Sequence, residues 1–180
     1  GARFRALDGI DIEEVGFRDA LRGGVTTVVV KPGSGNPIGG RTVAIKTWGG
    51  RTVDEQIIAD AVSVKSALGE NPQRVYGDRK ALPSTRLGVA AVLRDAFVAA
   101  KNYAAKRAAA ATEGKPFDRN LTHETLAAVL DGELIWDQHV HRHDDIATAI
   151  RISEEFGYRL VINHGTEAHK IADVLAEKNI

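Results

Sequence analysis

The histidines of one short segment carry the clearest chemistry in this sequence. In "WDQHVHRHDD", residues 136–145, three histidines occupy alternate positions, His139, His141 and His143. A fourth, His164, follows in "INHG". Neutral imidazole is a common ligand of zinc-like ions when a rigid scaffold holds it. The spacing therefore suggests a metal site, and the simpler alternative is that these histidines are ordinary polar residues at strand ends.

His139 and His164 each stand at the end of an apolar segment. The segments "LIWDQHV" and "YRLVINHG" both predict strands, and the helical pattern of "HDDIATAIRISEEFG" connects them. Neighbouring parallel strands bring their carboxyl ends to the same edge of a sheet, where the chemistry of such folds lies. We therefore expect the two imidazoles to lie close together and to face one cavity.

The other histidines are open to more than one interpretation. His141 shares a face with His139, because side chains alternate along an extended strand. It could support a ligand, contact a substrate or be structural. His143 falls at the start of the predicted helix and is expected to point to solvent, while His123 and His169 are most simply surface or hydrogen-bonded residues.

Two residues of an earlier segment could complete a metal site. Glu70 follows the predicted strand "AVSVKSALG" in what reads as a loop, where no helix-capping role explains a carboxylate. The other interpretation of Glu70 is an ordinary charged side chain in a solvent-exposed loop. Lys65 lies within that strand, and an inward lysine could be carbamylated to a metal-bridging carboxylate. A lysine that extends to solvent at a strand edge is the simpler interpretation. Asp144 and Asp145 are expected to be charges that the helix dipole favours.

The elements that must position these residues follow an alternating order. From Leu134 onward the pattern is strand, helix, strand, helix with short connections, which predicts a parallel sheet with right-handed crossovers. The β-branched run "VTTVVVK", residues 25–31, predicts a strand buried on both faces of such a sheet. "KPGSGNPIGG" predicts a turn-rich loop without a GxGxxG or Walker-type match. We therefore expect an α/β fold, a partial (β/α)8 TIM-type barrel with parallel strands and outer helices, rather than a doubly wound sheet.

The strongest predicted helix is "PSTRLGVAAVLRDAFVAAKNYAAKRAAAAT", with Ser84 or Thr85 as its N-cap. We expect its apolar stripe to pack on the outer face of the sheet and its alanine-rich end, residues 104–111, to fray. "THETLAAVLDGE" predicts another helix with Thr122 as N-cap. The stripe of the long helix consists of Leu87, Ala90, Ala91, Leu93 and Phe97.

Composition excludes several classes of function. The 180 residues suffice for one domain with a core, and Lys plus Arg equals Asp plus Glu at 24 each. Neutral charge without a basic run argues against a nucleic-acid partner. The absence of cysteine removes disulfides, thiolate zinc sites and thiol catalysis. No segment reads as a membrane span or a signal peptide, so a cytoplasmic protein without a membrane partner is expected.

The histidine motifs resemble a known family. "HVHRHDDIATAIRISEEFGYRLVINHGTEAHKIADVLAEKNI" resembles the metal-dependent amidohydrolases related to imidazolonepropionase, in which an "HAH" on the fifth barrel strand precedes an "HG" on the sixth. "GVTTVVVKPGSGNPIGG" and "SALGENPQRVYGDRKALPSTRLGVAA" are similar to segments of the same branch, so the resemblance covers nearly the whole chain. It implies a (β/α)8 barrel that holds one or two divalent metals, with zinc expected, and hydrolyses an amide, cyclic amide or similar C–N bond of a small molecule.

The resemblance also implies roles for individual residues. His139 corresponds to the fifth-strand ligand and His164 to the sixth-strand ligand. The third ligand would be Glu70 or, alternatively, a carbamylated Lys65, and His141 would contact substrate or support a ligand. The family's first-strand HxH and its last-strand aspartate, the general base, have no counterpart here, so no catalytic base is expected within the chain.

These departures lead to an expectation about the chain itself. Residues 1–180 would be the central part of one amidohydrolase barrel domain, truncated at both ends, and inactive alone. Its open sheet edges would then favour self-association. The competing hypothesis is a non-catalytic α/β assembly module with structural histidines, or a module that binds a phosphorylated ligand at "PGSGNPIGG" as an anion nest. Metal content and phosphate binding would separate these classes.

Overall fold

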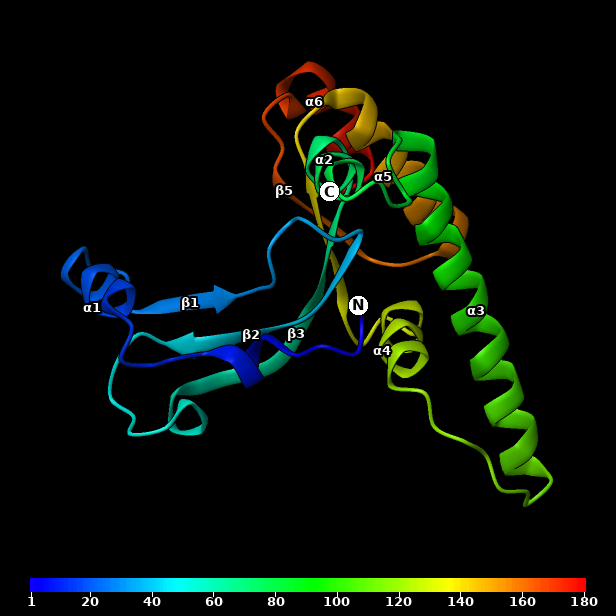
Figure 1. The fold of residues 1–180 in the computed structure, drawn as a ribbon, viewed down its shortest axis with the longest axis horizontal. Coiled ribbons are helices and arrows are strands. Elements are labelled where there is room, and N and C mark those ends of the chain that lie inside the picture. The colour runs from blue at the N-terminus through cyan, green and yellow to red at the C-terminus, as the bar shows by residue number, and fades with distance from the viewer.

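The computed structural model describes residues 1–180 and contains one curled five-stranded sheet in the order β1-β2-β3-β4-β5. Strands β1, β2 and β3 pair antiparallel, whereas β3, β4 and β5 pair parallel. The sheet is therefore mixed, with an antiparallel arm that continues into a parallel half, and its curl is compatible with part of a barrel (Figure 1). The strands span Thr27–Val30 (β1), Ile38–Lys46 (β2), Ile57–Ala67 (β3), Ile135–Val140 (β4) and Leu160–His164 (β5).

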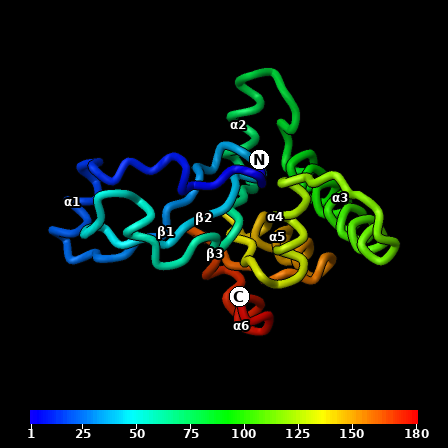
Figure 2. The backbone as a smooth tube through the Cα atoms, turned by 90° about the horizontal axis from the view of Figure 1, so that it is seen from below, coloured from blue at the N-terminus to red at the C-terminus, as the bar shows by residue number.

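The helices lie mainly beside the parallel half. Figure 1 shows α3, α4 and α5 on one side of β3 and β4, while α1 stands apart at the end of the antiparallel arm, and Figure 2 shows the same separation from below. None of the six helices combines the length and the hydrophobicity that a membrane crossing requires. They span Val15–Arg22 (α1), Glu70–Asp78 (α2), Arg86–Thr112 (α3), Leu121–Leu130 (α4), His143–Phe156 (α5) and Ala172–Glu177 (α6), with 3-10 turns at Ala6–Gly9, Val53–Gln56 and Ala168–Ile171.

A bend in β3 joins the two parts of the sheet. Residues 57–60 pair with β2 alone, whereas residues 63–67 also pair with β4. Ala61, between them, has a φ of 57° and falls where the pairing with β2 shifts register. An irregularity of this kind bends a strand and increases its twist. The bend carries β3 from the arm into the layer that bears the histidines.

The hydrophobic core fills the space between the parallel strands and their helices. Trp136 of β4 and Phe97 of α3 are fully buried, with ring centroids 4.8 Å apart. Tyr158 stacks on Phe97 at 4.8 Å, and Phe156 closes the cluster at 5.2 Å. Each such side chain contributes roughly 1.5–3 kcal/mol through burial. This aromatic cluster fixes α3 and α5 against the outer face of β4.

The predicted parallel pairing of residues 134–140 with 158–164 is confirmed, with β4 beside β5. The predicted strand in residues 25–31 is confirmed as β1, but its predicted burial on both faces of a parallel sheet is wrong, because β1 is an antiparallel edge strand whose residues alternate between exposed and half-buried. No strand lies beyond it, so its outer positions meet solvent. The parallel-strand prediction therefore holds for the C-terminal half of the sheet alone.

The loop formed by the glycine-rich segment "KPGSGNPIGG" is shorter than predicted. Its last residues, Ile38, Gly39 and Gly40, begin β2. A Cβ on Gly40 would lie 2.5 Å from the carbonyl oxygen of Phe4, and Gly40 has a φ of 142°. Glycine is needed here because the N-terminal segment crosses β2 closely. The helix α2, which follows β3, was not predicted. Pro72 lies in its first turn, where proline is tolerated.

The long helix α3 begins as predicted after Thr85, whose hydroxyl accepts a hydrogen bond from the Gly88 amide. The predicted stripe is wrong at Leu87 and Ala91, which are exposed because the helix turns a slightly different face to the sheet. Its alanine-rich end stays helical through Thr112 and is largely exposed. The buried residues are Val89, Ala90, Leu93, Phe97, Ala100 and Tyr103.

The N-cap of α4 is Asn120 rather than Thr122. The Asn120 side-chain oxygen accepts hydrogen bonds from the backbone amides of Thr122 and His123, which are unpaired within the helix. Asparagine ranks with the best N-cap residues, so the helix starts at Leu121, two residues earlier than an N-cap at Thr122 would allow. At the C-terminus, the single predicted helix is a 3-10 turn, residues 168–171, followed by the short α6.

Candidate metal centre

Three imidazole rings meet where β4 and β5 end. The ring centroid of His139 lies 4.7 Å from that of His141 and 4.6 Å from that of His164, with both contacts edge-on. The rings of His141 and His164 stack at 5.3 Å. In the parallel register, His139 lies opposite Asn163, and Val140 lies opposite His164. The predicted proximity of His139 and His164 is thus observed, while their role as metal ligands stays a prediction.

His164 reaches this cluster through an unusual backbone conformation. The Asn163 amide bonds to Asp137 on the same sheet face as His139, so strict alternation would direct His164 to the other face. Instead His164 has a φ of 72°, in the left-handed region that few non-glycine residues occupy. Such strain costs of the order of 1 kcal/mol and concentrates at functional sites. The strand end therefore bends so that the exposed imidazole of His164 contacts His139.

His139 is the most enclosed of the three histidines, with 3% of its surface exposed. Its Nε2 lies 2.9 Å from the side-chain nitrogen of Asn71, and its Nδ1 is buried without a hydrogen-bond partner. Burial and, to a lesser extent, the charge of Lys65 lower the pKa of His139 to about 4. Desolvation and then His141 lower the pKa of His164 as well. Both imidazoles are neutral at pH 7, which is the protonation state that binds metal ions.

Lys65 lies on the same face of the sheet as His139. It is 2% exposed, and its Nζ donates hydrogen bonds to the Ser34 hydroxyl at 3.0 Å and to the Ser66 carbonyl at 3.2 Å. Burial lowers the pKa of Lys65 to about 8. The interpretation of Lys65 as a solvent-reaching edge lysine is wrong, since β3 is a central strand and the loop with Ser34 covers it. A lysine in this environment is partly neutral near pH 8.

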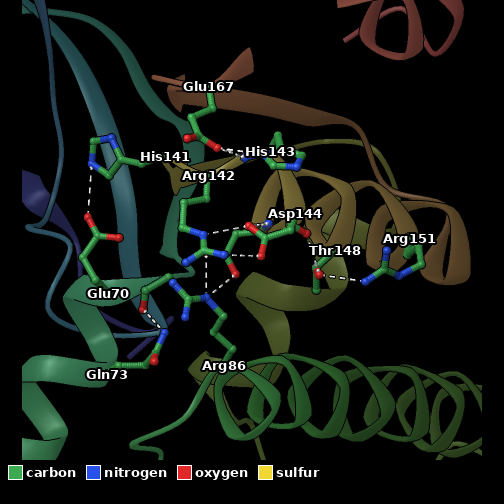
Figure 3. A network of polar contacts seen from close by, with 12 residues as sticks. Glu70, Gln73, Arg86, His141, Arg142, His143, Asp144, Thr148, Arg151 and Glu167 are labelled. Atoms are coloured by element: carbon green, nitrogen blue, oxygen red, sulfur yellow. Dashed lines mark hydrogen bonds and ion pairs between the residues drawn. The ribbon is translucent and has the colours of Figure 1, made fainter. Parts of the chain in front are cut away.

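Glu70 starts α2 rather than standing in a loop, so the loop prediction is wrong. The dipole of α2 favours a carboxylate in this first turn. Its Oε1 lies 3.9 Å from Nε2 of His141, and Figure 3 shows the two side chains pointing toward each other. His141 is also held from its other nitrogen, because Nδ1 lies 2.7 Å from the Thr166 hydroxyl. Glu70 is therefore beside the histidine cluster, but it is exposed.

His143 is exposed, as predicted, and it also has a side-chain partner. Its Nδ1 lies 2.8 Å from the carboxylate of Glu167, and its backbone amide donates to the same oxygen at 3.1 Å (Figure 3). Lys170 and then His143 hold the pKa of Glu167 at about 2. These contacts fasten the segment after β5 to the start of α5. His143 therefore has a local structural partner away from the three-ring cluster.

The two aspartates at the start of α5 have different partners. Asp144 bonds to the guanidinium of Arg142, whereas Asp145 is buried and accepts both of its contacts from Arg86 Nε, at 3.1 and 3.2 Å (Figure 3). The Asp145 carboxylate also lies 3.1 Å from the position of a Cβ on Gly69, whose φ is 81°. The prediction of a plain helix-dipole charge is thus incomplete for Asp145. It also packs against the turn that leads into α2.

A further polar network lies on the inner face of the sheet, which is the face that carries Lys65 and His139. The sequence patterns did not predict this network. Lys31 Nζ donates to Asp137 at 2.7 Å and to Asn163 at 3.1 Å, and Asn163 donates to the other oxygen of Asp137. Asp137 stands two residues before His139, so the alternation along β4 could have placed it on this face. Lys31, however, comes from the distant strand segment of β1. Asn71, the partner of His139, was likewise missed, because its segment was read as a loop.

The side chains around His139 are of the types that bind a divalent ion, but in this structure they are not arranged around a common ion position. No group of three or more His, Asp or Glu side chains has the arrangement that holds an ion, since the rings contact one another edge-on and stacked. The chemistry fits because two imidazoles are neutral and Nδ1 of His139 is buried without a partner, which a cation would satisfy. His139 and His164 would hold the ion, with a third donor from Glu70 or Lys65.

Comparison with known proteins finds similarity to proteins named amidohydrolase. No family model matches it. It is 28% identical to amidohydrolase tasK of Hapsidospora irregularis over 95% of its own length and 20% of that protein's. Its structure is similar to the crystal structure of an amidohydrolase from Thermotoga maritima, with a TM-score of 0.97 and a sequence identity of 50%. The match covers all of this chain and 47% of the Thermotoga chain.

The chain spans about half the length of the Thermotoga protein and about a fifth of tasK. Both relatives carry the name amidohydrolase, and the likeness to the Thermotoga structure extends through every element described above. These similarities support an amidohydrolase family for this chain.

Proposed function

We propose that this chain is part of a metal-dependent hydrolase that cleaves an amide or cyclic amide C–N bond of a small molecule. The observation that carries the proposal is the cluster of His139, His141 and His164 at the carboxyl ends of two neighbouring parallel strands. The amidohydrolase relatives and the motifs of the imidazolonepropionase branch support it. The curled parallel half of the sheet supports a (β/α)8 barrel for the whole protein.

Each histidine has a proposed role. His139 and His164 hold a divalent ion, with zinc the expected one because imidazole suits it. A bound ion of this kind activates water and polarises the substrate carbonyl. His141, held between Thr166 and Glu70, contacts the substrate or supports a ligand. No aspartate of residues 1–180 follows the family's last-strand pattern, so none of them is proposed as the general base.

The third ligand is proposed to be Glu70 or a carbamylated Lys65. For Lys65, the neutral amine nitrogen bonds to the carbon of CO₂ and releases a proton to solvent, which leaves a carbamate. The lowered pKa and the burial of Lys65 favour this reaction. For Glu70, the position beside His141 favours direct ligation. Growth with ¹³C-bicarbonate separates the two, since a carbamate carbon signal that Lys65→Met removes and Glu70→Gln keeps would identify the lysine.

The proposal is tested by zinc stoichiometry and amide hydrolysis of the full-length protein. His139→Asn is expected to lose bound zinc and to lower turnover at least 10³-fold, an order-of-magnitude estimate for removal of a ligand that serves both water and carbonyl activation. His169→Asn, which changes an exposed histidine outside the cluster, is the matched control and should keep both. Full zinc retention in the His139 variant would contradict the ligand assignment.

The alternative functions gain no support from specific contacts. The proposed anion nest is partly strand, and its Ser34 hydroxyl is engaged by Lys65. Self-association through the edge strands stays a proposal, with Val29 of β1 and Val161 of β5 as exposed apolar positions on those edges. A zinc-free protein with no hydrolytic activity in the assays above would favour a non-catalytic module instead.

A further inference from the structure

The contact between Asn71 and His139 links α2 to the histidine cluster. Asn71 is the second residue of α2, and its side-chain nitrogen lies 2.9 Å from Nε2 of His139. The imidazole is almost fully buried, and its other nitrogen, Nδ1, has no partner. Because a ring nitrogen either donates or accepts, the direction of this hydrogen bond determines which nitrogen of His139 carries the proton.

Two arrangements of this hydrogen bond are possible, and they differ in which atom is left for a ligand. If the Asn71 amide donates, the proton sits on Nδ1, where it is a buried donor without an acceptor. Rotation of the amide by half a turn exchanges its nitrogen and oxygen within the same space. The oxygen then accepts from Nε2–H, and Nδ1 carries a lone pair. An unpaired buried polar group is destabilising, and a cation at Nδ1 would give this nitrogen a partner.

We propose that Asn71 is a positioning residue whose amide oxygen accepts from Nε2–H of His139 and thereby presents the Nδ1 lone pair to the metal ion. The inference rests on the proposed metal site and assigns a residue that acts on it through His139. Ligating histidines commonly donate their other N–H to such a partner, which fixes the tautomer and the ring orientation.

The start of α2 is braced in a way that suits this role. The Gln73 side chain donates to the Gly69 carbonyl at 2.7 Å. The carboxylate of the buried Asp145, which is paired with Arg86, lies 3.1 Å from the position of a Cβ on Gly69. Gly69 immediately precedes Glu70 and Asn71. The turn before Asn71 is therefore held by two separate contacts, so the amide meets the imidazole at a defined position.

The test uses the full-length protein with ¹⁵N-labelled histidine and three variants. Asn71→Leu removes the amide at similar volume. Asn71→Asp supplies a carboxylate, which can accept from Nε2–H but cannot donate. Asn102→Leu is the control, because it removes an exposed asparagine amide of α3 that has no hydrogen bond to an imidazole. The measurements are the imidazole ¹⁵N spectrum of the metal-free protein, zinc affinity by titration against a chelator, and thermal unfolding to confirm that each variant folds.

In the metal-free wild type we expect the His139 proton on Nε2. Asn71→Leu should mix the two tautomers and weaken zinc binding 10- to 100-fold, the range found for lost partners of metal ligands. Asn71→Asp should keep the Nε2–H tautomer and bind zinc at least as tightly as the wild type. Asn102→Leu should change neither measurement appreciably.

Two results would overturn the inference. One is a wild-type His139 with its proton on Nδ1, and the other is an Asn71→Asp variant that loses zinc as Asn71→Leu does. If the wild type binds no zinc, the proposed function fails, but the ¹⁵N spectra still decide whether Asn71 sets the tautomer. The failure of the inference and the failure of the proposed function are therefore distinguishable.

Discussion

The two faces of β4 differ in the kind of side chains that surround them. On the outer face, Trp136 packs into the aromatic cluster, and Gln138 accepts hydrogen bonds from Trp136 Nε1 and from the Ser66 hydroxyl. On the inner face, His139 keeps a buried nitrogen without a partner, and the neighbouring Lys65 is buried with a lowered pKa. Adjacent residues of β4 thus have different surroundings: the outer face packs mainly against apolar and aromatic side chains, and the inner face holds buried ionisable side chains.

The difference shows that stability and chemistry are separated by side-chain alternation. A residue on the outer face meets helices α3 and α5 and gains from apolar burial. A residue on the inner face meets polar side chains from other strands, where desolvation lowers pKa values and leaves neutral nitrogens. Substitutions on the two faces should therefore have separable consequences, and the predictions below begin with the largest expected effect.

The largest expected effect is the loss of stability that Trp136→Ala causes on the outer face. The side chain is fully buried, so its loss removes apolar contacts and leaves a cavity, which costs about 3–5 kcal/mol in the free energy of unfolding. Urea unfolding followed by circular dichroism measures the loss. The zinc affinity of the molecules that remain folded should change less than about threefold, an estimate from the absence of a ligand role. A loss below about 1 kcal/mol would remove the contrast between the faces.

The inner face is tested by the pH dependence of stability that Lys65 causes. Its pKa is about 8 in the folded chain and 10.5 as an unperturbed lysine, so the unfolded state binds more protons between these values. Stability should then rise with pH across this window and be lost as the pH falls through 8. For metal-free, CO₂-free protein we expect a gain of about 2 kcal/mol from pH 7.5 to 9.5.

The control for this effect is Lys65→Met, which removes the titrating group and retains the bulk of the side chain. Urea unfolding at pH 7.5, 8.5 and 9.5 should show a shallower slope for the variant than for the wild type. Equal slopes for the two proteins would mean that Lys65 is solvated, and the inner face would then resemble an ordinary surface.

The smallest expected effect is that of His143→Ala, which sharpens the boundary of the inner-face site. His143 is half exposed and pairs with Glu167, so the loss should be below about 1 kcal/mol in unfolding free energy. Zinc affinity should change less than about threefold, because its ring lies outside the contacts among the other three histidines. A change in zinc affinity as large as that of His139→Asn would extend the metal site beyond the three-ring cluster.

Local sequence patterns were sufficient for the elements with strong periodicity. The segments 134–140 and 158–164 are strands, and the connecting segment is the helix α5, because apolar runs of these lengths and the helical spacing between them have few other solutions. The parallel pairing follows from the crossover that a helix provides. The sequence therefore predicts that His139 and His164 end neighbouring strands at one edge of the sheet. The contact between their rings also needs the φ of 72° at His164, which side-chain alternation does not predict.

Tertiary structure decided what depends on neighbours distant in the chain. The run 25–31 is not buried on both faces, because β1 lies at the edge of the sheet, and no local pattern reports a strand's position within a sheet. Lys65 is buried because Ser34 and its loop cover it, and His139 gains Asn71 because α2 folds over the end of β4. Burial and hydrogen-bond partners depend on these long-range contacts. Residue types and their spacing along the chain determine which strands carry the histidines and at which edge of the sheet those strands end.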